Sequence, residues 1–249
     1  MRRSQQLRRW KGQTRDTQRR LAKLKLSTVL NSAPWRDLPC EALVGNGDIW
    51  IGLNNFMRRH ATDLLVMGTI GRTGIRKFLL GSVAKEAMRE SRCPVLTVGP
   101  GSHPAEGTEF RRILYAIDFS PESLAAAPYA LAFSRNYRSR LTLVHALEGL
   151  PESPYLDAQM ARVGLRKLVP QVGDLATEPE VFVEMGPPAD IILRVADDAA
   201  SDLIVIGARG AGAFARLASH FGSVAHKIVC RAGCPVLTVR PLAGRDREQ

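Results

Sequence analysis

The chain has 249 residues, 45% of them hydrophobic, which is enough to form one or two substantial cores. No apolar run approaches the ~20 residues that a helix needs to cross a bilayer, and no signal-peptide core is visible. We therefore expect a cytoplasmic protein. The formal net charge is +11, but residues 1–36 alone hold eleven Lys or Arg and one Asp, a local net of +10, so the rest is close to neutral.

The basic N-terminal segment predicts an arm followed by a remnant helix. Residues 1–20 alternate basic and small polar side chains, and helical spacing of apolar residues begins at Leu21, Leu24 and Leu26. Such an arm can bind nucleic acid or anionic lipid through its charge. Trp10 is the only aromatic residue in 1–20 that could stack on a base. We favour a solvated, partly disordered extension without a membrane partner, and binding of nucleic acid by the arm is the less favoured alternative.

The four cysteines do not have the spacing of a zinc site. Cys230-x3-Cys234 lacks a matching second pair, and Cys234 repeats Cys93 at the start of a strand, leaving Cys40 alone. We expect no metal site, and buried free thiols in a reducing compartment.

One stretch of the chain occurs twice, as residues 63–98 and residues 202–239. In both copies an apolar run ends at a glycine, a second glycine follows, a Gly-Ser-Val-Ala segment opens a helical pattern, and Cys-Pro-Val-Leu-Thr-Val closes the stretch. The copies lie 139 residues apart before the loop (63 to 202) and 141 after it (81 to 222). This spacing indicates duplicated domains, because solenoid repeats have periods of roughly 20–50 residues.

The repeated stretch has the composition of a phosphate-binding cradle. A buried parallel strand, a Gly-x-x-Gly turn and a Gly-Ser pair at a helix start place free N–H groups and a hydroxyl at the positive end of a helix dipole. The alternative is that the glycines serve tight turns and that Ser82 and Ser223 cap helices. The residues alone leave both interpretations open.

The spacing Gly68-x2-Gly71-x9-Gly81-Ser82 resembles the nucleotide loop of the universal stress protein family. The ending Cys-Pro-Val-Leu-Thr-Val resembles that family's last strand, and Ile113–Ser123 resembles its first strand and turn. The resemblance implies an α/β fold: two copies of an open, doubly wound parallel five-stranded sheet, Rossmann-like and of the adenine nucleotide alpha hydrolase type. The family's strand order is 3-2-1-4-5.

The second copy is expected to be complete and the first incomplete. The first copy has 46 residues before Gly47, without an Asp-Phe-Ser strand, whereas the second has about 75 before Gly186 in its domain. We therefore expect the first domain to be truncated, lacking its opening β-α-β portion. The expected organisation is an arm and remnant helix (1–36), a partial domain (37–100), a linker (101–109), a complete domain (110–241) and a tail (242–249).

Strands and helices are expected to alternate in both copies. The first copy should contain a strand at Cys40–Val44, which a crossover could pair with Leu64–Met67, and a helix at Asp48–His60. Its remaining elements are a helix at 82–91 and strands at 63–67 and 94–98. In the second copy we predict strands at 112–117, 141–147, 180–184, 202–206 and 235–239, and helices at 122–136, 155–169, 188–199 and 223–231. Ser120 should be an N-cap, with Pro121 at the first helical position.

The resemblance implies a nucleotide site mainly in the second domain, with Asp118 contacting the adenosine part. Its candidate residues are Ala116, Asp118, Val144, Ile206, Gly207, Arg209, Gly210, Gly222, Ser223 and Val224. Eleven residues separate Gly210 from Gly222, where the family has nine. The first copy has the family's spacing, in Gly68, Gly71, Gly81 and Ser82, but not the Asp strand. His145 is expected to be structural.

The resemblance implies an ATP-binding sensor or regulator of the stress response, with Mg²⁺ accompanying the nucleotide. No catalytic triad, metal spacing or paired carboxylates indicate an enzyme, and no base is assigned for the slow ATP hydrolysis that relatives allow. The alternative is an interaction module without nucleotide. In either case we expect self-association through the last strands, as a pseudo-dimer of the two domains or as a homodimer.

Overall fold

The computed structural model describes residues 2–32, 35–69, 80–102, 109–148, 153–168, 175, 177–208 and 223–241, with residues 2–15 as backbone only. The chain divides into two compact units, Met1–Phe56 and Met57–Gln249. Each unit is described by itself below.

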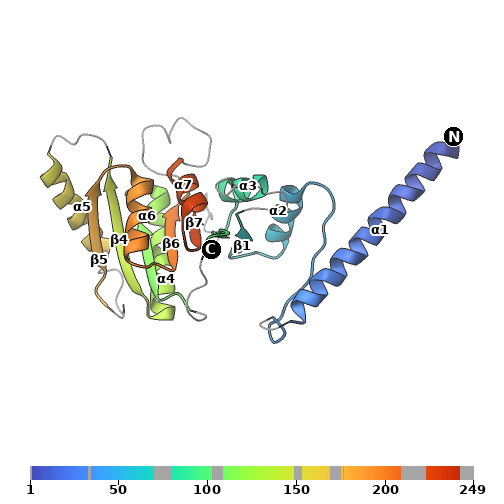
Figure 1. Ribbon diagram of the computed structural model, residues 1–249, viewed down its shortest axis with the longest axis horizontal. Coiled ribbons are helices and arrows are strands. Elements are labelled where there is room, and N and C mark those ends of the chain that lie inside the picture. Colours follow the sequence, from blue (N-terminus) through green and yellow to red (C-terminus); the bar gives the residue numbers. More distant parts are fainter. Residues whose placement is uncertain are drawn as a thin grey trace, which may run out of the picture. The chain divides into compact units, whose positions relative to one another are not determined.

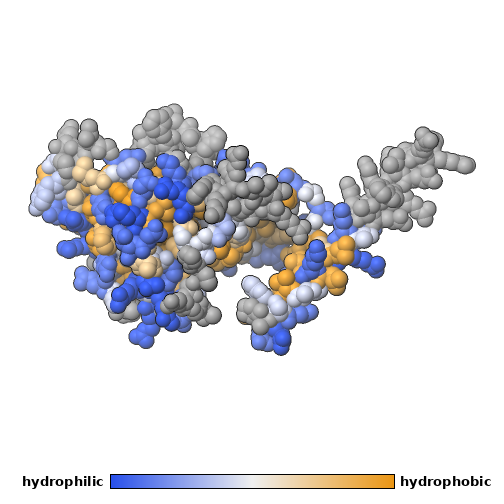
Figure 2. All heavy atoms as spheres, in the orientation of Figure 1, coloured by the Kyte–Doolittle hydropathy of each residue, from blue (hydrophilic) through white to orange (hydrophobic). Residues whose placement is uncertain are grey.

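Helix α1 (Arg2–Leu30) dominates the first unit (Figure 1). The expectation of a partly disordered arm was wrong here, because this segment contains no proline and is rich in Arg, Lys, Gln and Leu, all good helix formers. The helix ends in a turn in which the Ser32 N–H donates to the Val29 carbonyl (3.1 Å). Leu21, Leu24 and Val29 are exposed along it, and Figure 2 shows apolar (orange) side chains beside basic (blue) ones on the described part of α1.

Residues 39–46 form no strand, so the prediction of a strand at Cys40–Val44 was wrong. The segment is bounded by Pro39 and Gly45, and a strand is stable only where a neighbour pairs with its backbone. The expectation of four buried thiols was wrong: Cys40 is exposed, Cys93 and Cys230 are half-buried, and Cys234 is buried. Helix α2 (Ile49–Arg59) follows; the Asp48 carboxylate accepts from the Ile51 N–H (2.9 Å) at its start.

The second unit is built on a seven-stranded sheet with the order β1-β2-β7-β6-β3-β4-β5 (Figure 1). The strands are β1 (Leu65–Gly68), β2 (Val95–Val98), β3 (Arg112–Ala116), β4 (Arg140–Leu147), β5 (Glu180–Met185), β6 (Leu203–Gly207) and β7 (Val236–Val239). Neighbouring strands are parallel except β2 and β7, which are antiparallel. The last five strands in this order form the expected doubly wound five-stranded sheet of the second copy. The first copy contributes β1 and β2.

The two copies are therefore joined through their last strands. In the β2–β7 ladder Leu96 pairs with Leu237, and these two residues are themselves equivalent in the repeat (96 to 237, the offset of 141). The pairing is thus close to two-fold symmetric within one chain, which is the internal pseudo-dimer expected from the sequence. Pairing between separate chains stays a prediction.

Helices cover both faces of the second copy's sheet. They are α4 (Pro121–Tyr137), α5 (Pro154–Leu168), α6 (Pro188–Asp198) and α7 (Ser223–Arg231); α3 (Ser82–Glu90) belongs to the first copy. Ala126 of α4 and Leu165 of α5 pack into one core with Leu203 and Val205 of β6. Helix α6 contacts β4 and α7, while α3 contacts β2 and α7 contacts β7. Side chains alternate along each buried strand between these two layers.

Candidate functional site

The carboxyl ends of β3, β4 and β6 meet at one edge of the sheet. Strand β3 lies between the other two, and the chain proceeds from it through β4 to one side and through β6 to the other. This is the topological switch point at which open α/β sheets bind ligands. The predicted residues Ala116, Val144 and Ile206 all lie near these strand ends and are buried. Ala116 and Val144 are direct register partners.

Asp118 lies just beyond β3, and the start of α4 holds its side chain. The Asp118 Oδ1 accepts from the Ser120 N–H (3.0 Å) and from the Ser120 hydroxyl (2.6 Å). The Ser120 Oγ in turn accepts from the Ser123 N–H (3.1 Å), so Ser120 is the N-cap of α4 and Pro121 its first residue, as predicted. Asp118 is half-buried. Its carboxylate is thereby oriented before any ligand binds.

Phe119, next to Asp118, is a residue that the sequence analysis missed. Its φ of +58° lies in the left-handed region, which is uncommon for a bulky residue. Packing holds it there: its ring lies 5.1 Å from the His145 ring, centroid to centroid. On α5, an added Cβ on Gly164 would come within 2.9 Å of the Phe119 Cζ, so the Phe119 ring lies directly against Gly164. No sequence signal marks this contact beyond a glycine in a helical segment.

His145 connects the ends of β3 and β4. Its Nδ1 lies 2.7 Å from the Ile117 carbonyl oxygen, and because a carbonyl only accepts, Nδ1 carries the proton. This contact and the packing against Phe119 give His145 a positioning role beside the candidate site.

Tyr115 lies in β3, three residues before Asp118, and is buried. Its hydroxyl donates to the Ser123 carbonyl in the first turn of α4. Burial raises the pKa of the Tyr115 hydroxyl well above its usual value, and the nearby Asp118 carboxylate raises it further. Tyr115 therefore stays neutral and acts as a fixed hydrogen-bond donor that anchors α4 to β3.

The phosphate side of the predicted site is described in part. Gly207 ends β6 and is half-buried, and the next residue, Ala208, donates its N–H to the Val239 carbonyl (2.8 Å). Val224 lies half-buried in the first turn of α7. The predicted residues Arg209, Gly210 and Gly222 lie outside the described residues, as does the side chain of Ser223. A phosphate-binding role for the lengthened loop between Gly210 and Gly222 thus stays a prediction.

The first copy presents the matching elements without the Asp strand. Gly68 ends β1, and Gly81 is the N-cap residue of α3, donating its N–H to the Thr69 carbonyl (2.8 Å). Ser82 is exposed at the first helical position and does not cap the helix, which removes the capping alternative for this residue. Gly71 lies outside the described residues.

No group of three or more His, Cys, Asp or Glu side chains in the described part of the chain is placed to hold a metal ion. None of the helices described is both long and apolar enough to span a bilayer.

The comparison with protein families decides the identity of this architecture. The sequence matches the model of the universal stress protein family over residues 4–99 and again over residues 109–240. The chain belongs to the universal stress protein family. The first match begins at residue 4, so α1 lies within the extent of the family domain and does not precede it.

Individual relatives agree with this assignment. A universal stress protein of Thermus aquaticus is 34% identical over 140 residues, which cover 53% of this chain and 99% of the relative. A universal stress protein of Mycobacterium tuberculosis is 28% identical over 186 residues, covering 72% of this chain and 62% of the relative. The crystal structure of a universal stress protein from Archaeoglobus fulgidus shares the fold, with a TM-score of 0.71 at 22% identity, over 90% of this chain and 80% of that one.

Proposed function

We propose that this universal stress protein binds an adenine nucleotide, ATP, at the carboxyl edge of its second copy and acts as a sensor or regulator in the stress response. The observation that carries the proposal is the Asp118 carboxylate, held by Ser120 at the switch point between β3 and β6. It shares this sheet edge with Gly207 and lies at the same end of the sheet from which α7 begins. The sheet edge thus combines a fixed acceptor, apolar strand ends and a helix N-terminus.

Each part of this edge suits one part of the ligand. A carboxylate accepts hydrogen bonds from the hydroxyls of a ribose or the amino group of adenine, which is the role proposed for Asp118. Ala116, Val144 and Ile206 offer an apolar surface for the base. The start of α7, with Gly222, Ser223 and Val224, offers N–H groups to the phosphates, and Gly207, Arg209 and Gly210 lead into that loop. Mg²⁺ would bind through the phosphates.

The proposed activity is reversible binding, with no residue assigned to catalysis. Protein purified from cells should be denatured and any released nucleotide identified, and ATP should then be titrated by calorimetry. We expect a dissociation constant in the micromolar range, and Asp118→Ala should weaken binding by about 1 kcal/mol or more, the value of a hydrogen bond to a charged group. Asp198→Ala, which removes an equally charged but exposed carboxylate on α6, is the matched control.

Two results would contradict the proposal. The first is folded protein that carries no nucleotide after purification and gives no heat when ATP is added. Equal losses for Asp118→Ala and Asp198→Ala would mean that ATP binds elsewhere.

The alternative is an interaction module without nucleotide. The last strands, through which the sequence predicted association, already pair with each other inside the chain. An interaction module built on this fold would therefore use another surface.

A further inference from the structure

Among the described residues, strand β1 is more exposed than its counterpart β6. The repeat offset of 139 places Leu64 and Val66 on Leu203 and Val205. In the second copy both residues are 0% exposed, whereas Leu64 is 36% and Val66 57% exposed. On β2, Val98 is 39% exposed, and its counterpart Val239 on β7 is 1% exposed (98 to 239, the offset of 141).

These side chains are exposed because the described residues of the first copy contain no counterpart of the strand β3 or of the helix α4. In the second copy β3 pairs with β6, and α4 packs across β6 and β7. The described first copy has β2 beside β1 and no counterpart of β3 on its other side. We call β1 together with Leu64, Val66 and Val98 the open-edge surface.

Alternate backbone N–H groups of β1 point to the side on which the described first copy has no strand. The N–H groups of Leu65 and Thr69 donate to β2, to the carbonyls of Pro94 (3.0 Å) and Val98 (3.1 Å). Because successive N–H groups of a strand alternate in direction, those of Val66 and Gly68 are directed to the open side. A ligand for this edge must therefore supply an extended strand.

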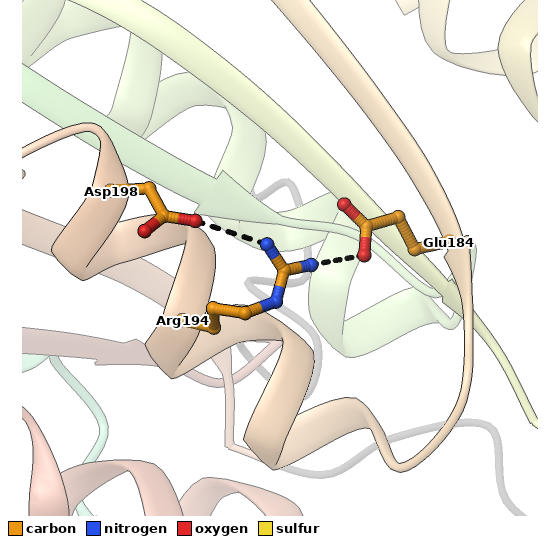
Figure 3. Close-up of polar contacts among 3 residues, drawn as sticks. All are labelled: Glu184, Arg194 and Asp198. Atoms are coloured by element: carbon orange, nitrogen blue, oxygen red, sulfur yellow. Dashed lines mark hydrogen bonds and ion pairs between the residues drawn. The ribbon is translucent and has the colours of Figure 1, made fainter.

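The two ends of the sheet differ in their protection. Strand β5, at the far end, carries Glu180 and Glu184, and Glu184 forms an ion pair with Arg194, which also pairs with Asp198 (Figure 3). Charges on an edge strand oppose the addition of another strand. Strand β1, Leu-Val-Met-Gly, has no charge and no proline. Of the two edge strands in the described sheet, β1 is thus the one without charges.

We propose that β1 pairs antiparallel with β1 of a second copy of this chain, so that the sheet continues across a two-fold axis. Identical strands satisfy each other's backbone groups in this arrangement, as a two-fold interface requires. The chain already joins equivalent strands in this way at β2 and β7. The pairing would place the Val66 side chains of the two copies on the same face and cover the open-edge surface. It does not depend on nucleotide binding.

The test is the oligomeric state of the full chain, measured by sedimentation over a range of concentrations. We expect a monomer–dimer equilibrium for the wild type. Val66→Lys should raise the dissociation constant of the dimer at least about tenfold, because two like charges would then face each other across the new ladder. Val163→Lys, on the exposed face of α5, is the matched control: Val163 is 51% exposed, and the variant should dimerise like the wild type.

A second measurement, on the unaltered chain, covers the case in which Val66→Lys fails to fold. Hydrogen exchange at the amides of Val66 and Gly68 should slow as the protein concentration rises, while that of Leu65, which is bonded to β2, should not change. A wild type that is monomeric at every concentration would overturn the proposal. So would a folded Val66→Lys variant that dimerises like the wild type, or amides of Val66 and Gly68 whose exchange is independent of concentration.

Discussion

The side chains of Thr97 and Thr238 form reciprocal hydrogen bonds across the β2–β7 junction. The Thr97 hydroxyl donates to the Val236 carbonyl (3.1 Å), and the Thr238 hydroxyl donates to the Val95 carbonyl (3.2 Å). Both threonines are buried. They are equivalent in the repeat (97 to 238), as are the two valines (95 to 236), so one bond is the symmetry copy of the other. The junction between the two copies is therefore fixed by side chains as well as by the backbone ladder.

This reciprocity predicts similar costs for removing either hydroxyl. Thr97→Val and Thr238→Val keep the shape of the side chain and remove one buried hydrogen bond each. Each should lower the free energy of unfolding by about 1 kcal/mol, measured by chemical denaturation. Thr142→Val, a buried threonine on β4 away from the junction, is the control and should have a smaller effect. A large cost for one junction threonine and none for the other would contradict the symmetric arrangement.

The cysteines should differ strongly in reactivity toward a thiol reagent. Burial raises the pKa of the Cys234 thiol to about 12, and the carboxylates of Asp202 and Asp197 contribute. Because the thiolate is the reactive form, Cys234 should not react in the folded protein at pH 8, whereas the exposed Cys40 should react first. Labelling followed by peptide mapping measures this, and Cys40→Ser should remove the fastest phase. Rapid labelling of Cys234 in folded protein would contradict the prediction.

The second copy was predictable from the sequence because its signals are local. Its strands are rich in apolar residues, with β6 a continuous apolar run, and all five lie within about two residues of their predicted bounds. Ser120 followed by Pro121 marked the start of α4 correctly. The repeat with its constant offsets showed that two copies of one fold are present, and this led to the junction of last strands.

The failures of prediction have different physical reasons. The segment Cys40–Val44 has the composition of a strand, but a strand requires a paired neighbour, which composition does not reveal. The basic charge of the N-terminal segment suggested disorder, although its residues favour the helix α1. Phe119 adopts a left-handed conformation while its ring packs against His145 and Gly164, and both contacts lie far away in the sequence.

Asp202 and its counterpart Asp63 should contribute very differently to stability. The Asp202 carboxylate accepts from the backbone N–H groups of Arg111 (2.8 Å) and Arg112 (3.0 Å), which ties the start of β6 to the start of β3. Asp63 has the same place in the first copy (63 to 202), where the described residues contain no counterpart of β3. We expect Asp202→Ala to lower the free energy of unfolding by about 2 kcal/mol, as for hydrogen bonds to a charged acceptor.

Asp63→Ala is the natural control, since it removes the same group at the equivalent position. Its effect should stay within about 0.5 kcal/mol, the usual range for a surface substitution. Urea denaturation of both variants and the wild type provides the comparison. Equal losses for the two variants would show that Asp202 does not act through β3.

The helices α3 and α7 also place equivalent residues near each other. His226 in α7 corresponds to Lys85 in α3 (85 to 226). Burial lowers the pKa of His226, and the positive charge of Lys85 lowers it further. The His226 Nε2 also lies 3.9 Å from the Cys230 sulfur on the same helix. The folded state therefore favours the neutral imidazole.

This environment predicts a pH dependence of stability with a defined sign. Below the ordinary histidine pKa of 6.5, the unfolded chain binds a proton at His226 that the folded chain binds less readily. The free energy of unfolding should therefore fall as the pH drops from 7 to 5. In His226→Gln this part of the decline should disappear, and in Lys85→Gln it should shrink, because the repulsion between the two cations is lost. Denaturation curves of the three proteins across this pH range measure the effect. A His226→Gln variant that declines as steeply as the wild type would show that other groups control the acid sensitivity of the fold.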